Sequence, residues 1–202
     1  MRHQTLPADQ LALFEMPVFL PKESTPGGFL YKEDFLSVAE EKELLEIFKT
    51  LPFTHDTFNG YEAFRRTVGY GWTSRPELPD FIVPLRDRAA AFAGIDPATL
   101  DSALISEYTP GAAIGWHRDK TSDKSVKGHV VGVSLAAGCH FRLRRARWSG
   151  PKPGGEIVGY DRFGVIAEPR SVYCMRGESW SRWQHSIPRV EALRYSITFR
   201  DF

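Results

Sequence analysis

The second half of the chain is a series of short apolar segments separated by turn residues. About eight of these segments read as β-strands, because β-branched and aromatic residues in them are bounded by turn-forming residues. They span residues 103–108, 114–116, 129–136, 140–143, 155–160, 164–167, 171–175 and 193–199. So many short strands in succession predict a jelly roll, or double-stranded β-helix.

Two helices are expected before the strands. Ser37 and Glu40 form a capping box, and apolar residues then recur at helical spacing, which predicts a helix over residues 37–50. A second helix is predicted over residues 78–93, where Gly94 stops it. The expected fold class is therefore α+β, mainly β, with the N-terminal helices packed on one face of the roll.

These patterns divide the chain into three stretches of one structural domain. Residues 1–33 are rich in proline and read as an extended arm. Residues 34–100 carry the helices and, at about 53–78, a polar and aromatic segment. Residues 101–202 form the double-stranded β-helix, and a length of 202 residues suits a single core.

Charge and cysteine content limit the classes of protein and partner. Lys and Arg total 26 against 25 for Asp and Glu, so a net charge of +1 gives no global attraction to polyanions, although a local basic patch can bind nucleic acid. Cys139 and Cys174 cannot form a disulfide framework, which suits a reducing cytoplasm. Glu15 and Pro17 interrupt the apolar stretch 11–20, so we expect no signal peptide, no membrane partner and a cytoplasmic monomer.

A histidine and a carboxylate stand two residues apart at the end of one predicted strand. Side chains alternate along a strand, so His117 and Asp119 project to the same side and can share a metal ion. They supply two ligands of a two-histidine, one-carboxylate triad, which leaves positions open on Fe(II). For these two residues alone, a solvated pair or a salt bridge is the simpler alternative.

The chain offers a third ligand further downstream. His185 lies just before the last strand and could return to the mouth of the roll, where a closed sheet brings strands together. Glu178 or Asp161 is the alternative carboxylate ligand. The other histidines are expected to be surface or hydrogen-bonded core residues: His3, His55, His129 and His140.

The last strand places charge on a face that points inward. Alternation puts Arg194, Ser196, Thr198 and Arg200 on one side of the strand, opposite the apolar residues between them. Two inward cations carry a large desolvation cost unless an anion meets them. A dicarboxylic cosubstrate would provide that anion.

Taken together, these motifs resemble the AlkB family of Fe(II)- and 2-oxoglutarate-dependent dioxygenases. The resemblance covers roughly residues 103–201. It rests on His117-x-Asp119, on His185, on Arg194-x-Ser196-x-Thr198-x-Arg200, and on the accompanying Tyr108-Thr109-Pro110-Gly111, Val133-Ser134-Leu135 and Gly177-Glu178-Ser179.

The resemblance implies three cofactors, Fe(II), 2-oxoglutarate and O2, with the two histidines and the aspartate as iron ligands. Arg194 would pair with the distal carboxylate of 2-oxoglutarate through a bidentate contact. Arg200 would lie nearer the end that chelates iron, and Tyr108 would hydrogen-bond the cosubstrate, with Thr198 beside it.

This chain departs from the family pattern at three positions. Ser106 and Ser196 stand where the family usually has asparagine, and a serine hydroxyl reaches less far, so contacts to 2-oxoglutarate would be looser or water-bridged. Thr121 replaces an acidic residue that follows the metal motif in DNA-repair members. That replacement bears on the recognition of a positively charged alkylated base.

Residues 53–78 have two interpretations. They form either a short hairpin whose aromatic side chains pack on the core, or a lid that stacks a planar substrate on Tyr70 or Trp72. In the second case Arg65 and Arg66 would hold phosphate.

Further substrate contacts are expected beside the metal motif, from Trp116, Lys120 and Thr121. The basic run 142–152 is either a solvated strand and turn or a ridge that follows phosphates.

The leading hypothesis from the sequence is oxidative dealkylation of bases in DNA or RNA, with the base flipped into the pocket. One alternative is a 2-oxoglutarate-dependent oxygenase that acts on a protein, a lipid or a small molecule. The other is a jelly-roll binding module without a catalytic metal.

Overall fold

The computed structural model describes residues 25–58, 61–71, 76–119, 128–150 and 155–201. Residues 1–24, most of the predicted arm, lie outside these ranges. The elements are β1 (Phe29–Lys32), α1 (Val38–Phe48), β2 (Thr54–Phe58), β3 (Tyr61–Tyr70), α2 (Val83–Ala93), a 3-10 turn (Pro97–Thr99), β4 (Ser102–Tyr108), β5 (Ile114–His117), β6 (Val130–Leu135), β7 (Cys139–Trp148), β8 (Ile157–Ala167), β9 (Val172–Met175), α3 (Glu178–Ser181), β10 (Gln184–Ile187) and β11 (Arg194–Arg200).

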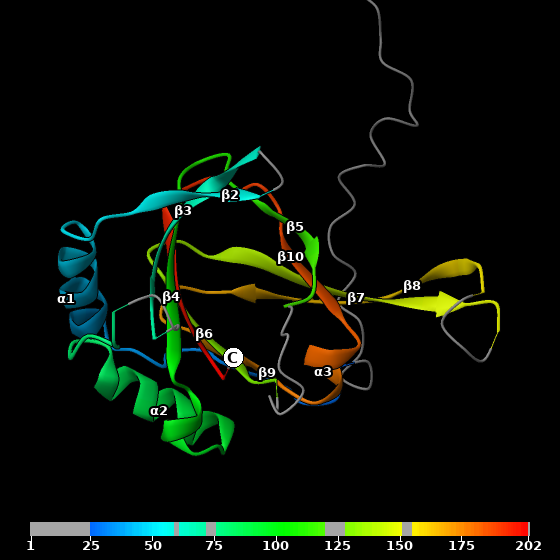
Figure 1. Cartoon of the computed structure of the whole chain (residues 1–202), viewed down its shortest axis with the longest axis horizontal. Coiled ribbons are helices and arrows are strands. Elements are labelled where there is room, and N and C mark those ends of the chain that lie inside the picture. The colour runs from blue at the N-terminus through cyan, green and yellow to red at the C-terminus, as the bar shows by residue number, and fades with distance from the viewer. Residues whose placement is uncertain (1–24, 59–60, 72–75, 120–127, 151–154, 202) are drawn as a thin grey trace, which may run out of the picture.

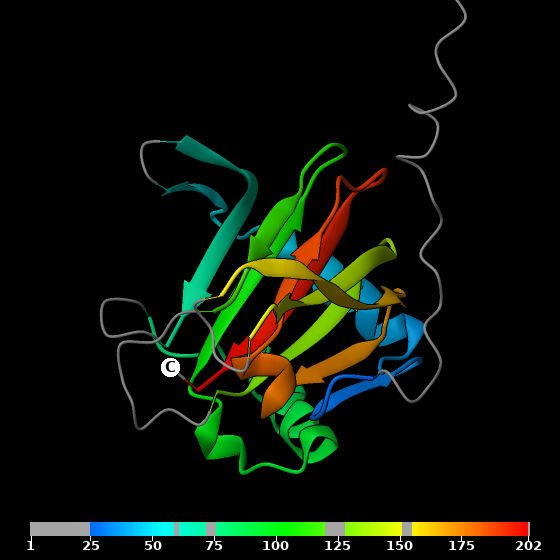
Figure 2. The same cartoon turned by 90° about the vertical axis from the view of Figure 1, so that its right-hand side faces the viewer.

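The strands form two antiparallel sheets, as the sequence predicts. One has seven strands in the order β1-β9-β6-β11-β4-β3-β2, and the other has four in the order β5-β10-β7-β8. Figure 2 shows strands of the larger sheet lying side by side, and Figure 1 shows the β7–β8 hairpin projecting away from the body. The expected mainly β, α+β double-stranded β-helix is thus confirmed.

Helices α1 and α2 cover the outer face of the seven-stranded sheet (Figure 1). Phe48 of α1 and Leu85 of α2 are buried against strand residues such as Ile105 and Ile197. Burying one such side chain contributes about 1.5–3 kcal/mol, so this face anchors the sheet. The opposite face of the sheet is left to the interior of the roll.

Side chains of β11 alternate between the two faces of the seven-stranded sheet, as the sequence predicts. Tyr195, Ile197 and Phe199 pack in the core beneath the helices. Arg194 points to the other side, into the space between the two sheets, where a second apolar cluster includes Tyr108 and other residues of both sheets. A fully buried arginine therefore stands inside the roll.

Some predicted boundaries are wrong. Helix α2 begins at Val83 rather than residue 78, because Ile82 is the N-cap and a proline occupies the first turn. Residues 155–160 and 164–167 are not two strands but parts of β8, which pairs with β7 from Cys139 to Trp148. Gly164 lies within that ladder and forms no turn, so the glycine misled the sequence interpretation.

Strands β1 and β10 were not predicted. β1 lies within the stretch read as an extended arm, yet it pairs with β9 over four residues. β10 has only four residues and precedes Pro188, so periodicity alone gives little signal. No helix among the described residues has the length and apolar character needed to cross a bilayer.

The buried carboxylate of Glu41 on α1 forms hydrogen bonds with residues at the ends of strands in the seven-stranded sheet. Glu41 accepts hydrogen bonds from the backbone N–H of Ala136 (2.9 Å) and from Arg170 Nη1 (3.0 Å). Glu41→Ala should lower the free energy of unfolding by about 1–3 kcal/mol, because both donors lose a buried acceptor. Urea denaturation measures this loss. Glu43→Ala, at an exposed position of the same helix, should change it by less than about 0.5 kcal/mol, and equal losses would contradict the role of Glu41.

Candidate metal centre

Three side chains predicted to be metal ligands meet at the edge of the four-stranded sheet. His117 on β5 lies directly opposite His185 on β10, and their ring centroids are 4.1 Å apart. Asp119 follows two residues after His117, with 3.8 Å between its Oδ1 and His117 Nε2. One ligand atom from each of the three lies within 4.8 Å of the others, which is a geometry that can hold one ion.

A backbone carbonyl fixes which nitrogen of His117 faces the candidate metal site. His117 Nδ1 lies 2.8 Å from the carbonyl oxygen of Gly115. Since a carbonyl only accepts, Nδ1 carries the proton and donates, and Nε2 keeps its lone pair toward Asp119. Such a bond orients a ligating imidazole and selects its tautomer.

Both imidazoles are in the neutral form that metal binding needs. Burial lowers the pKa of His185 to about 3, although the Asp119 carboxylate acts in the opposite direction. Burial also lowers the pKa of His117, against the effect of the Gly115 carbonyl. Neither ring is protonated near neutral pH, so each offers a nitrogen lone pair.

The aspartate supplies the negative charge of the site. Burial acts to raise the pKa of Asp119, but Arg200 and the two histidines outweigh it, and the pKa is lowered. Arg200 Nη2 lies 3.7 Å from Asp119 Oδ1. Asp119 Oδ2 is buried and accepts no hydrogen bond from the described residues. A buried carboxylate oxygen without a donor is a free ligand position.

Arg194 provides a second unsatisfied group, inside the roll. Its side chain is 0% exposed, and its Nη2 donates to Ser134 Oγ at 3.0 Å. Its guanidinium carbon lies 5.1 Å from the ring centroid of Tyr108. Within the described part of the chain, Arg194 Nε and Nη1 have no acceptor. Leaving a buried cation so poorly paired is costly, and an anionic ligand would supply the acceptors that these two nitrogens lack.

Hydroxyl groups line the sheet between the two arginines of β11. Ser196 lies opposite Ser134 on β6 and Ser106 on β4, and all three are buried. Thr198 Oγ1 donates to the carbonyl of Leu104 at 3.2 Å. The serines that depart from the family pattern therefore face the same space as Arg194.

Aromatic rings close the inner wall of this space. The rings of Phe141 and Tyr173 stack at 4.4 Å, and Phe141 lies 5.7 Å from His185. Gly132 makes room for the ring of Tyr173, since a Cβ at this position would lie 2.2 Å from it. A dry wall strengthens the electrostatic contacts made beside it.

Only one of the predicted phosphate-binding arginines lies beside the site. Arg65 Nη1 donates to the Tyr108 hydroxyl at 3.3 Å, on the inner face of the sheet. Arg66 points to the opposite face, where it pairs with the buried Glu107 and stacks on Phe53. Adjacent residues of a strand face opposite ways, and the sequence alone did not show which of the two faces inward.

Two of the predicted aromatic contacts, Tyr70 and Trp116, do not join the candidate metal ligands either. Tyr70 is buried in the core beneath the helices, as the hairpin interpretation predicts. Trp116 neighbours His117 on β5 but lies against Arg142 and Arg144 on the outer face of the small sheet. Trp72, Lys120 and Thr121 lie outside the described residues.

The alternative ligands are engaged elsewhere. Asp161 and Glu178 both pair with Arg145. His129 Nδ1 contacts Asp201 at 2.7 Å. The sequence interpretation gave no role to Ser134, which anchors Arg194; a lone polar residue on the apolar strand β6 was its signal.

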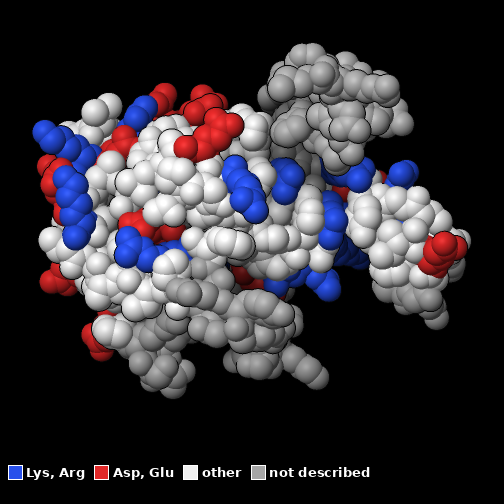
Figure 3. Space-filling model, turned by 90° about the horizontal axis from the view of Figure 1, so that it is seen from above, with Lys and Arg blue, Asp and Glu red and all other residues white. Residues whose placement is uncertain are grey.

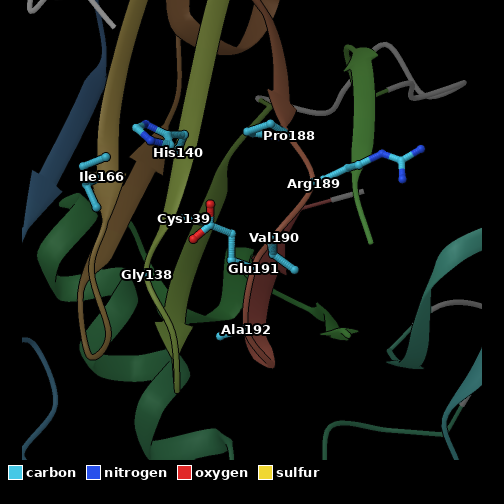
Figure 4. Close-up of a pocket in the computed structure, with 9 residues that line it drawn as sticks. All are labelled: Gly138, Cys139, His140, Ile166, Pro188, Arg189, Val190, Glu191 and Ala192. Atoms are coloured by element: carbon cyan, nitrogen blue, oxygen red, sulfur yellow. The ribbon is translucent and has the colours of Figure 1, made fainter. Parts of the chain in front are cut away.

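A separate cavity of about 330 Å³ opens where β7 begins and the loop to β11 passes (Figure 4). None of the three candidate ligands lines it. Cys139 lines this cavity and also lies next to Arg194 of the candidate site. Burial raises the pKa of the Cys139 thiol, although Arg194 acts to lower it. The side chain of Arg189 points away from the other residues that line the cavity (Figure 4).

The chain resembles proteins of known family. A family model for the 2OG-Fe(II) oxygenase superfamily matches residues 67–200. Over 179 residues the chain is 29% identical to the alkylated DNA repair protein ALKBH8 homolog of Arabidopsis thaliana, covering 81% of this chain and 51% of that protein. It is 26% identical over 178 residues to the tRNA (carboxymethyluridine(34)-5-O)-methyltransferase alkbh8 of Xenopus tropicalis, covering 81% and 26%.

Two further likenesses concern a shorter region and the fold. The probable RNA/DNA demethylase ALKBH6 of Danio rerio is 28% identical over 111 residues, which is 52% of this chain and 46% of that protein. A solved structure of OsALKBH1 has a TM-score of 0.62 at 17% identity, covering 86% of this chain and 97% of that one. The chain thus spans only about half or less of the length of these sequence relatives.

Proposed function

Because the chain belongs to the 2OG-Fe(II) oxygenase superfamily and is an AlkB-like member of it, we propose that it dealkylates alkylated bases in DNA or RNA. Its cofactors are Fe(II), 2-oxoglutarate and O2. The alternative of a binding module without a catalytic metal is wrong, since the superfamily match coincides with a candidate iron site.

When bound, the iron and 2-oxoglutarate use O2 to hydroxylate a substrate C–H bond, and the cosubstrate leaves as succinate and CO2. On an N-methyl group, the hydroxymethyl product then breaks its C–N bond, releasing formaldehyde and leaving a proton on the nitrogen.

The residues of this chain have separate tasks in that reaction. Neutral His117 and His185, with ionised Asp119, would hold Fe(II) and leave positions open. Arg194 would bind the far carboxylate of 2-oxoglutarate through its two unpaired N–H groups. The Phe141–Tyr173 wall would keep water from the space between them.

One observation supports the proposal above the others. Arg194 is a completely buried cation whose Nε and Nη1 have no acceptor in the described part of the chain, in the same interior as a His-Asp-His cluster. A dicarboxylic acid that reaches from metal to guanidinium fits both. The preference for nucleic acid draws on relatives whose names are those of a DNA repair protein and an RNA/DNA demethylase.

The experiment is formaldehyde release. Purified protein with Fe(II), 2-oxoglutarate and O2 should release one formaldehyde for each methyl group removed from methylated DNA or RNA oligonucleotides. Unmodified strands of the same sequence are the control. No turnover on single- or double-stranded DNA or RNA, with succinate formation that responds instead to a protein, a lipid or a small molecule, would favour the other oxygenase function.

A further inference from the structure

Three arginines share the outer face of the four-stranded sheet. Arg142 and Arg144 lie on β7, and Arg162 lies on β8 directly opposite Arg144. We call these three the arginine face. Figure 3 shows basic side chains on one face of the molecule, several of them close together near the middle of the view.

Alternation shows that these arginines point away from the metal centre. Leu143, between Arg142 and Arg144, is buried in the core between the sheets and pairs with His185. Its neighbours must therefore project to the other side. Trp116, next to His117 on β5, is covered by both β7 arginines, which puts it on the same outer face.

The guanidinium groups are held in place by neutral partners. Arg144 lies 4.5 Å from the ring centroid of Trp116 and 4.6 Å from that of Tyr160. Its Nε donates to Gln184 Oε1 at 2.8 Å, and Arg142 Nε donates to a serine hydroxyl of β10 at 3.2 Å. Aromatic and amide contacts fix the orientation of these cations but do not neutralise them.

None of the carboxylates in the described ranges forms an ion pair with the arginine face. The contrast with the other side of the same strand is clear, because Arg145 pairs with both Asp161 and Glu178. Burial lowers the pKa of Arg142, and the like charge of Arg144 lowers it further. Arranged cations that repel one another form a site for an external anion.

The spacing of the three charges favours a polymer of phosphates. Residues two apart on a strand are about 6.8 Å apart, and neighbouring strands are about 4.8 Å apart. Arg142 and Arg144 lie along β7 and Arg162 lies across from Arg144, so the three positions form the corner of a compact cluster. Successive phosphates of an extended strand have a comparable spacing, and guanidinium groups match phosphate oxygens well.

Through Trp116, the arginine face reaches the edge strand that carries a candidate metal ligand. β5 is an edge strand of the four-stranded sheet. Trp116 faces the outer side of this sheet, and the next residue, His117, faces the candidate metal site. A flexible single strand of nucleic acid could therefore pass from the outer face, around the edge at β5, to the metal side. We propose that the arginine face binds the phosphate backbone of single-stranded nucleic acid flanking the base at the metal centre, an inference that rests on the proposed function.

The test is the salt dependence of binding to fluorescein-labelled, unmodified 12-nucleotide single strands of DNA and RNA, followed by anisotropy with the full chain. Each lost phosphate contact reduces the slope of log K against log salt by about 0.7 for single strands. The triple variant Arg142→Gln, Arg144→Gln, Arg162→Gln should therefore lose about 2 from the slope. Its affinity at about 0.1 M salt should fall at least tenfold.

Two further variants keep the test interpretable. Arg147→Gln removes the same charge from the same strand, but Arg147 lies near Asp161 rather than on the arginine face. The affinity of this variant should stay within about twofold of that of the unsubstituted protein, and its slope within about 0.3. Arg162→Gln alone changes an exposed position, so it tests the face even if the triple variant does not fold, and should lose about 0.7 from the slope.

The outcomes separate this inference from the proposed function. The inference would be overturned if the variants of the arginine face had the same slope as the unsubstituted protein. It would also be overturned if Arg147→Gln reduced the slope as much as Arg162→Gln does. Equal binding of a poly-glutamate peptide, with the same dependence on the three arginines, would assign the face to an acidic protein and overturn it too. Formaldehyde release with unchanged slopes refutes this inference alone, whereas face-dependent binding without turnover on any methylated strand refutes the proposed function alone.

Discussion

Asp119→Ala and His117→Ala should each abolish metal-dependent turnover while the protein stays folded. Either change removes one of three ligand atoms that lie within 4.8 Å of one another, and two ligands hold Fe(II) poorly. We expect turnover to fall at least about a thousandfold, which corresponds to roughly 4 kcal/mol of transition-state stabilisation. Metal analysis after gel filtration and formaldehyde or succinate release measure the two losses.

A histidine of the same sheet supplies the matched control. His140 lies on β7 at an exposed position, away from the three ligands, so His140→Ala should keep both metal content and turnover. The melting temperature of each variant reports whether the fold survives. Turnover that persists in both ligand variants would refute the assignment of His117 and Asp119.

Arg194→Ala should raise the 2-oxoglutarate concentration needed for half-maximal turnover far more than it alters the affinity for the other substrate. Its unpaired Nε and Nη1 are the donors assigned to the cosubstrate. Removing one partner of a buried, hydrogen-bonded charge pair costs about 2–5 kcal/mol, or about 30-fold to several thousandfold in affinity. Succinate production over a range of 2-oxoglutarate concentrations measures the change.

Two further variants test whether the charge of Arg194 or the planar geometry of its guanidinium group is needed. Arg194→Lys keeps the charge without the planar pair of donors, so its effect should lie between those of arginine and alanine. Arg189→Ala removes an exposed arginine shortly before β11 and should leave the 2-oxoglutarate requirement unchanged. An unchanged requirement in Arg194→Ala would mean that the anion binds elsewhere.

The cluster of candidate metal ligands could be predicted in large part from local rules. Alternation predicted that His117 and Asp119 lie on one side, and their ligand atoms do lie together, although β5 ends at His117. Alternation also placed Arg194 on the inner face of β11. His185 needed one further assumption, that a closed roll returns the chain to its starting edge. The register of β10 against β5 meets that assumption.

Contacts set by pairing between distant strands were not predictable in the same way. Ser134 anchors Arg194 because β6 lies next to β11, and Gly132 makes room for a ring on β9. No periodicity in a single sequence specifies which strands become neighbours. The same limit explains why Arg65 and Arg66 could not be told apart, although they face opposite sides of the sheet.

A bound metal ion would also stabilise β5, because of the position of this strand in its sheet. This strand has only four residues, and its ladder to β10 joins two residue pairs with a shift between them. Ligands from both β5 and β10, joined by one ion, would cross-link a weakly held border strand to its neighbour. Chelation should then loosen Ile114–His117 and speed amide exchange there, while the sheet beneath the helices keeps its protection.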